Sequence, residues 1–213
     1  MSVQVQLRRD TTTNVQANKG AVGEVFVDTT VNRLVVQDNA TNGGFPTPTA
    51  LSVQNGGNTN NSNSGSGSDF DHTLAFTIPA NFMTAARAFR VTAHFQISTG
   101  TAAPTLAHKL KLGSLVLSAN AAVTPANGLA NVQFSFQWIF QATQAPGAAA
   151  NVQCAELTNP NVGGNLNNLN TIAMPVAIAT NAAVVVKVST IWGSAGTGTN
   201  TIALNQLIVE ALN

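Results

Sequence analysis

Charged side chains are scarce in this chain. Only 17 of its 213 residues are charged, which is 8%, whereas a globular domain typically carries about 25%. Nine basic and eight acidic residues leave a net charge of +1. A neutral chain without a basic face is a poor nucleic-acid binder, because neutralisation of phosphates dominates that affinity. Solubility must instead come from amide and hydroxyl groups, and the chain contains 25 Asn and 25 Thr.

Cysteine and long apolar runs are also lacking. The single Cys permits neither an internal disulfide nor a cysteine-based zinc site. No window approaches 18 consecutive apolar residues, so we expect no membrane insertion. The N-terminal sequence MSVQVQLRRD also lacks the apolar stretch of a signal peptide. What remains is a β-rich chain with an uncharged surface.

Catalytic motifs are absent as well. The sequence has no GxSxG, HExxH, P-loop or GxGxxG pattern. Glycoside hydrolysis needs two carboxylates a few ångströms apart, and the C-terminal part offers four acidic residues that lie far apart in sequence: Asp69, Asp71, Glu156 and Glu210. A distant pair could still converge in space. We nevertheless expect no enzyme, no cofactor and no metal site.

One break in composition divides the chain. Residues 54–68 read QNGGNTNNSNSGSGS, a stretch with nothing that can bury apolar surface and so offset the entropy of ordering the backbone. We predict a flexible linker at 53–68, between a β-rich anchor and trimerisation module at 1–52 and a larger domain at 69–213. The short module has few large apolar residues, so it needs oligomerisation or a docking partner to form a core.

Alternating strands are predicted throughout both segments. In the N-terminal module Val3–Leu7 alternates, and Glu24–Asp28 and Arg33–Gln37 form a hairpin-like pair. The larger domain has eight candidate strands, at His72–Ile78, Phe89–Ile97, Leu106–Leu117 with a β-bulge at Gly113, Val132–Phe140, Asn151–Leu157, Ile172–Ile178, Val184–Trp192 and Ile202–Ala211. Pro175 places the sixth strand at a sheet edge or a bulge. We therefore predict an all-β fold, an antiparallel β-sandwich of jelly-roll type.

The N-terminal residues carry a recognisable pattern. VQLRRDTTTNV, followed by GAVGEVFVDTTVNRLVVQDNATNGGFP, resembles the N-terminal module of tailed-bacteriophage appendage proteins, known from tail fibres and from a trimeric tropism determinant. The resemblance covers about residues 3–46. It departs from the common pattern at Asp10, where many members have Gly, and at Gln37-Asp38-Asn39, where they have Gly-Asp-Gly. Residues Thr77–Leu117 are also similar to a β-sandwich module of phage structural proteins.

The resemblance implies a virion protein. It would be a homotrimer that binds other virion proteins of the tail or capsid, and an intertwined trimer would complete the thin core of the module. The virion-anchor residues would be Arg8, Arg9, Glu24, Asp28 and Arg33. The alternative for the two N-terminal arginines is a local ion pair with an acidic residue of the same module, namely Asp10, Glu24 or Asp28.

Three histidines and the lone cysteine are the other candidates for chemistry. Asp69, Asp71 and His72 are close in sequence, but an extended chain points His72 away from the two carboxylates, which favours a polar strand start over a metal site. His108 falls on an apolar face and is predicted to be a hydrogen-bonded core or interface residue. His94 is predicted to face outward, either in solvent or against a symmetry mate. Cys154 is predicted to be a small core residue.

Receptor binding is expected at the loops, because recognition usually lies on loops of a rigid scaffold and Asn can both donate to and accept from glycan hydroxyls. Trp138 and Trp192 are core residues by default. Trp192, at a strand end, is the better candidate for sugar stacking. The candidate receptor contacts are Asn159, Asn161, Asn165, Asn167, Asn168, Trp192, Thr197 and Asn200. The alternative is that these loops only connect the strands.

Two functions follow from the sequence. The first is a short trimeric fibre or appendage of the virion that contacts a host surface receptor or glycan through its C-terminal sandwich. The second is a capsid decoration, head-fibre or tail adaptor protein with a purely structural role.

Overall fold

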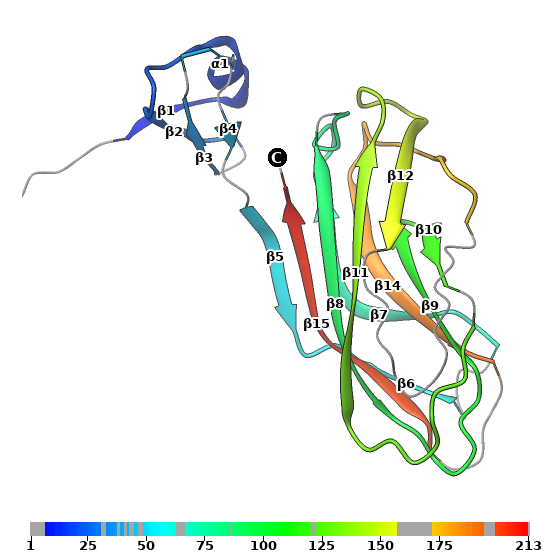
Figure 1. The fold of residues 1–213 in the computed structure, drawn as a ribbon. Helices are drawn as coiled ribbons and strands as arrows, with labels where there is room; N and C mark the ends of the chain where they lie inside the picture. Colours follow the sequence, from blue (N-terminus) through cyan, green and yellow to red (C-terminus); the bar gives the residue numbers. More distant parts are fainter. Residues whose placement is uncertain are drawn as a thin grey trace, which may run out of the picture. The chain divides into compact units, whose positions relative to one another are not determined.

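The computed structural model describes residues 7–30, 33–37, 39–40, 42, 45–46, 49–62, 67–85, 87–120, 122–156, 172–193 and 199–212. The chain divides into two compact units, residues 1–49 and residues 50–211 (Figure 1). Both units are built mainly from strands, which confirms the all-β prediction. No helix in the described part of the chain is long and apolar enough to cross a membrane.

The N-terminal unit is a four-stranded sheet with one short helix. Its strands lie in the order β1 (Arg8–Asp10), β2 (Val25–Asp28), β3 (Arg33–Val36) and β4 (Phe45–Pro46). The predicted hairpin is confirmed, since β2 and β3 pair antiparallel with Asp28 opposite Arg33. Helix α1 (Thr12–Ala17) was not predicted; the Thr11 side chain caps it by accepting from the Asn14 amide. Of the predicted first strand, residues 3–6 lie outside the described residues.

The core of this unit is small. Among its described residues only three apolar side chains form a buried cluster: Val15, Phe26 and Val35. Polar groups complete the interior. The Asp28 carboxylate is fully buried and accepts from the Thr12 hydroxyl at 2.7 and 2.8 Å, and the Gln37 side chain accepts from the Gly20 amide.

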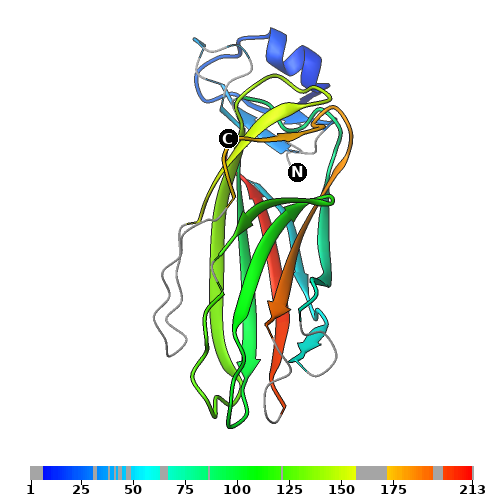
Figure 2. The same cartoon turned by 90° about the vertical axis from the view of Figure 1, so that its right-hand side faces the viewer.

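The larger unit is a sandwich of two sheets, as predicted. The small sheet has the order β10 (Leu115–Ala119), β9 (Leu106–Leu112), β14 (Val184–Trp192), β7 (Phe70–Ile78). The large sheet has the order β13 (Val176–Ile178), β12 (Ala150–Glu156), β11 (Val132–Ala142), β8 (Ala88–Ser98), β15 (Thr201–Ala211), β5 (Thr49–Asn55), and β6 (Thr59–Asn61) also pairs with β15. Figure 2 shows the long strands of this unit running side by side.

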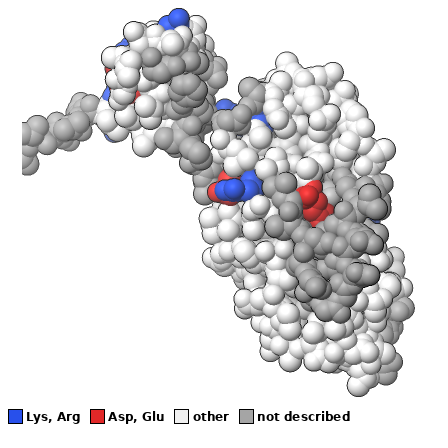
Figure 3. All heavy atoms as spheres, in the orientation of Figure 1, with Lys and Arg blue, Asp and Glu red and all other residues white. Residues whose placement is uncertain are grey.

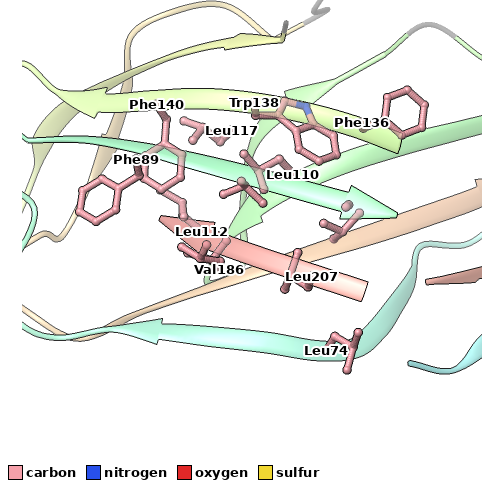
Figure 4. Close-up of a cluster of buried hydrophobic side chains, with 14 of the residues drawn as sticks. Leu74, Phe89, Leu110, Leu112, Leu117, Phe136, Trp138, Phe140, Val186 and Leu207 are labelled. Atoms are coloured by element: carbon pink, nitrogen blue, oxygen red, sulfur yellow. The ribbon is translucent and has the colours of Figure 1, made fainter. Parts of the chain in front are cut away.

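The core lies between the two sheets, because alternation along each strand points every second side chain inward. On β8 the inward residues Phe89, Val91, Ala93, Phe95 and Ile97 are all buried, as predicted from their period of two. The Phe89 and Phe140 rings stack at 5.1 Å, and side chains from the small sheet meet them (Figure 4). This packing supplies the stability of the unit, because burial of an aromatic or branched side chain contributes about 1.5–3 kcal/mol.

Two details of strand assignment differ from or refine the prediction. Residues Leu106–Leu117 do not form one bulged strand; they form the hairpin β9–β10, in which Leu112 pairs with Leu115 around Gly113 at φ +64°. A glycine at the first position of a two-residue loop favours this tight turn. The Pro175 strand is shortened to β13, which lies at the sheet edge as predicted.

The segment predicted as a flexible linker is built into the sandwich over its described residues 53–62. Strands β5 and β6 both pair with β15, and the turn between them contains Gly56 at φ +80°. The segment is held by hydrogen bonds and not by apolar burial. The Asn60 amide donates to Thr190 Oγ1 at 3.0 Å, and Asn58 Oδ1 accepts from the Thr73 amide at 2.9 Å. A composition argument that counts only apolar surface misses such bonds.

Candidate functional site

A shallow groove of about 440 Å³ lies on the outer face of the large sheet. The residues that line it come from four neighbouring strands: Asn55 of β5, His94 and Phe95 of β8, Gln133, Phe134 and Ser135 of β11, and Asn205 and Gln206 of β15. Strand register brings the polar ones into a row, because Ser135 pairs with His94 and His94 pairs with Gln206. Gln206 continues the row to Asn55, since its Nε2 donates to Asn55 Oδ1 at 2.8 Å.

A β-bulge shapes the groove. The pairing of β15 with β8 shifts between Leu204 and Gln206, so Asn205 is an extra residue on β15. A bulge lets two consecutive side chains lie on the same side of a sheet, and here both Asn205 and Gln206 line the groove. The Asn205 carbonyl accepts from the Gly56 amide at 2.9 Å, which fixes the bulge to the turn after β5.

Several side chains of the groove have unused hydrogen-bonding capacity. Within the described part of the chain, no hydrogen-bond partner is present for the side chains of His94, Gln133, Ser135 and Asn205. Together they offer amide, hydroxyl and imidazole groups, which can both donate and accept. Phe95 and Phe134 alternate with these residues along β8 and β11, and their rings stack at 5.5 Å on the core side of the sheet.

The charged residues of the sandwich gather away from the groove, and the largest group is on the outer face of the small sheet. Lys111 Nζ contacts Asp69 at 2.9 Å and Asp71 at 2.7 Å, while Lys109 pairs with Asp69 and Lys187 with Asp71. Burial alone would raise the pKa of Asp69 and of Asp71, but the lysine hydrogen bonds outweigh it and hold both pKa values below the ordinary value. The five side chains therefore form one continuous ion-pair network.

The other charges of this unit are engaged as well. Arg90 Nε donates to Glu210 at 2.7 Å, and the Arg87 guanidinium lies 4.0 Å from the centroid of the Phe82 ring. Glu156 contacts His108 Nε2 at 3.1 Å between the two sheets. Figure 3 shows one face of the molecule, on which charged atoms form only small spots on the sandwich. All nine charged residues of positions 50–211 thus have a partner, and none lines the groove.

The predicted anchor residues have mixed roles. Arg8 lies 3.8 Å from Glu24 and 4.7 Å from the Phe26 ring centroid, so the local ion pair considered for it is present. Arg9 is exposed. Asp28 is an interior residue that binds the Thr12 hydroxyl, and its burial removes it as a docking contact. Arg33 begins β3, opposite Asp28.

Two of the predicted receptor contacts are buried. Trp192 is 0% exposed, so its ring cannot stack on a sugar, and its indole Nε1 donates to the Asn60 carbonyl at 3.5 Å. Asn200 is also 0% exposed; its Oδ1 accepts from the Gly100 amide and its Nδ2 donates to Ser62 Oγ. The prediction is wrong for both, because the side chains at these strand ends are packed inside the sandwich. The other predicted contacts lie outside the described residues: Asn159, Asn161, Asn165, Asn167, Asn168 and Thr197.

The histidines lie on the sides of their strands that were predicted, but His72 is buried where a polar strand start was expected, and Cys154 is half-buried beside the core. His72 points away from Asp69 and Asp71 and is 3% exposed; burial lowers its pKa to about 4. His108 is a core residue whose ring centroid lies 3.4 Å from that of Phe136, and burial lowers its pKa although Glu156 opposes the shift. Burial, aided by the charge of Glu156, raises the pKa of the Cys154 thiol to about 12. No three His, Cys, Asp or Glu side chains gather as metal ligands in the described ranges.

The groove itself was not predicted from the sequence. Outward-facing His94 was recognised, but its neighbours in the row are separated from it by 39 or more positions in the chain. The alternation of polar residues on β8, β11 and β15 indicates a polar outer face. Only strand order, register and the one-residue bulge show which of these residues meet.

Comparisons with known proteins identify the N-terminal unit. Residues 5–38 match the family model of the major tropism determinant N-terminal domain. A comparison with curated proteins found no match.

Solved structures show only distant likenesses. The infectious bursal disease virus VP2 subviral particle is 12% identical with a TM-score of 0.31, over 78% of this chain and 33% of that one. A conserved carbohydrate esterase from Shiga toxin-encoding bacteriophage phi24B is 12% identical with a TM-score of 0.32, over 76% and 90%. Winged bean acidic lectin complexed with methyl-alpha-D-galactose is 10% identical with a TM-score of 0.27, over 93% and 96%. The chain spans about a third of the VP2 chain, and at these TM-scores the likenesses support no inference.

The family match confirms the resemblance predicted from the sequence motifs LRR, GE, DTT and NRL, which fall within residues 5–38. It covers much of the N-terminal unit and none of the sandwich. The N-terminal segment is therefore similar to a module of the tropism-determinant type, which places the chain in a bacteriophage virion.

Proposed function

We propose that the chain is a non-enzymatic, short trimeric appendage that is held to the virion by its N-terminal unit and contacts the host surface through its sandwich. The match of residues 5–38 to the tropism-determinant module carries this proposal. It is supported by the division of the chain, since the matched unit is followed by a separate compact sandwich of residues 50–211. Scaffolds of this kind provide a rigid surface for recognition.

The trimer is proposed from the size of the N-terminal core. The described residues of this unit bury a cluster of only three apolar side chains, which is small for a unit of about 50 residues. Strands from neighbouring copies would complete it. Light scattering on the purified full chain tests this point: a mass of about three times 21.9 kDa is expected. A stable monomer of 21.9 kDa would contradict it.

The absence of catalysis is proposed from the state of the carboxylates. Asp69 and Asp71 are held by lysines, Glu210 by Arg90, and Glu156 contacts His108 in the core. A hydrolytic pair requires one carboxyl to donate a proton and a second to act on the opposite side of the substrate bond. In the described part of the sandwich no acidic residue lines the groove.

Binding to the cells that the phage infects is the test of the host contact. The full chain, labelled with a fluorophore, should bind these cells in a saturable manner and compete with its unlabelled form. A folded chain that binds no more than an unrelated β-sandwich of the same charge would contradict the proposed contact.

A second function is supported by the part of the predicted linker that is built into the sandwich. A flexible linker would count against a rigid structural element, but β5 and β6 are paired strands at residues 49–55 and 59–61. A capsid decoration, head-fibre or tail adaptor protein is therefore the alternative. Electron microscopy of intact particles, with the chain located in the density, separates the two: capsid three-fold positions favour the alternative.

A further inference from the structure

We infer that the groove on the large sheet binds an uncharged polysaccharide, through its amide, hydroxyl and imidazole groups. The inference deepens the proposed host contact and rests on it. It also moves the binding surface from the loops at the ends of the sandwich to a sheet face. The residues that carry it are Asn55, His94, Gln133, Ser135, Asn205 and Gln206.

The size and the composition of the groove suit a sugar chain. Its volume of about 440 Å³ falls within the range of roughly 300–1,000 Å³ that is typical of ligand sites. Hydroxyl groups of a sugar both donate and accept, and so do the amides of Gln133 and Asn205 and the hydroxyl of Ser135.

The groups that would bind the sugar are already positioned. His94 and Ser135 lie on paired central strands of the sheet, and the bulge at Asn205 is fixed by the Gly56 amide. Side chains on paired strands lose little freedom when a ligand binds, which lowers the cost of association. Because His94, Gln133, Ser135 and Asn205 have no partner among the described residues, the ligand would not have to displace internal hydrogen bonds.

The distribution of charge determines the class of polysaccharide. Arg90 and Glu210 lie on the same face of the sheet as His94. They neutralise each other in an ion pair, with 2.7 Å between Arg90 Nε and Glu210 Oε2. The lysines and aspartates form their network on the small sheet, the opposite side of the sandwich. An anionic polysaccharide would find no free cation in the groove and would lose hydration without compensation. A neutral one has no such cost.

The test is a glycan array that carries both neutral and anionic bacterial polysaccharides, probed with the full chain. Two variants remove groove groups that have no partner among the described residues: His94→Ala and Gln133→Ala. The matched control is Gln153→Ala, an exposed glutamine of β12 outside the groove. Each groove variant should weaken binding to neutral glycans by about fivefold, the value of one hydrogen bond, and the control should not.

Salt dependence gives a second readout. Binding to an uncharged ligand should change by less than about twofold between about 0.05 and 0.5 M NaCl, because screening acts only on charges. Exclusive binding to anionic glycans, a steep fall with salt, equal affinities of the groove and control variants, or no glycan bound by the folded chain would each overturn the inference. A change of oligomeric mass in the groove variants would also overturn it, since the groove would then be an interface between copies.

Failure of the inference can be told from failure of the proposed host contact. If the full chain binds host cells and the groove variants bind equally well, the contact stands and the groove is not its site. If the chain does not bind host cells at all, the proposed contact itself is wrong.

Discussion

At the scale of single residues, buried polar groups take the place of apolar ones in this sandwich. His72 is the central case. Its Nδ1 lies 3.1 Å from the Asn58 carbonyl, so Nδ1 carries the proton and donates, because a carbonyl can only accept. Its Nε2 then accepts from the Thr190 hydroxyl at 3.1 Å, and that hydroxyl accepts from the Asn60 amide. The neutral ring thus joins β7 to β14 and to the turn before β6.

His72 makes stability depend on pH. Its folded-state pKa of about 4 is below its ordinary value of 6.5, so between these values the unfolded chain binds more protons than the folded one. The contribution of the neutral His72 ring to the free energy of unfolding is complete above pH 6.5 and is lost as the pH falls toward 4. The variant His72→Gln should reduce the fall in the free energy of unfolding over this range by up to about 3 kcal/mol, as measured by urea denaturation.

The control for this prediction is Gln153→Ala, which replaces an exposed glutamine that does not titrate. It should leave the pH dependence of the free energy of unfolding as in the parent chain. His108 acts in the same direction as His72 because burial lowers its pKa too, so the His72 variant should retain some dependence. An identical pH dependence of the free energy of unfolding for the parent chain and His72→Gln would show that burial does not hold the ring neutral.

Lys111 is the second residue whose replacement is informative. It is 7% exposed and its amine bridges Asp69 and Asp71. Lys111→Met leaves two carboxylates facing each other without the cation between them and should cost about 2 kcal/mol of unfolding free energy. Lys109→Met, which removes a more exposed lysine with one partner, should cost less than about 1 kcal/mol. Chemical denaturation of both variants checks this, and equal losses would contradict a special role for the bridge.

At the scale of elements, the edge of the large sheet depends on close approach of backbone to backbone. A Cβ atom on Gly57 would lie 2.2 Å from the Leu204 carbonyl oxygen, next to the bulge of β15. No side chain can be accommodated there unless the β5–β6 turn moves. Strand pairing on this edge and the shape of the groove therefore both require glycine at this position.

Gly57→Ala should accordingly destabilise the sandwich by about 1–3 kcal/mol, the usual cost of forcing extra atoms into a packed site. Gly147→Ala is the control, because a Cβ atom there meets no atom closer than 3.8 Å and the backbone is not left-handed. Thermal denaturation with limited proteolysis of residues 50–62 measures both effects. A Gly57 variant as stable and as resistant as the control would mean that the turn adapts freely.

Much of the strand pattern could be predicted because alternation reports burial directly. β8, β11, β14 and β15 each place apolar residues on one face with a period of two. The β9–β10 hairpin was missed, although Gly-Ser between two leucines is a tight-turn signal. The β5–β6 segment was missed because its ordering comes from backbone pairing and from Asn side chains that bind distant strands, which composition does not reveal. The groove was missed for a related reason, since its residues meet only through register.

At the scale of the whole molecule, charge is divided unevenly. Eight of the 17 charged residues lie within residues 1–38 and nine within the much longer sandwich unit. In that unit every charge has a partner, so the surface it presents is neutral and polar. Such a surface forms contacts by hydrogen bonding and shape, with little electrostatic steering.

The most direct test of the central claim, that the sandwich contacts the host surface for the virion, is competition for phage adsorption. Host cells are incubated with the purified full chain, and the rate at which particles adsorb is then measured. The account predicts a dose-dependent fall in adsorption that Gln153→Ala preserves and His94→Ala weakens. Unchanged adsorption in the presence of saturating, folded and trimeric chain would contradict it.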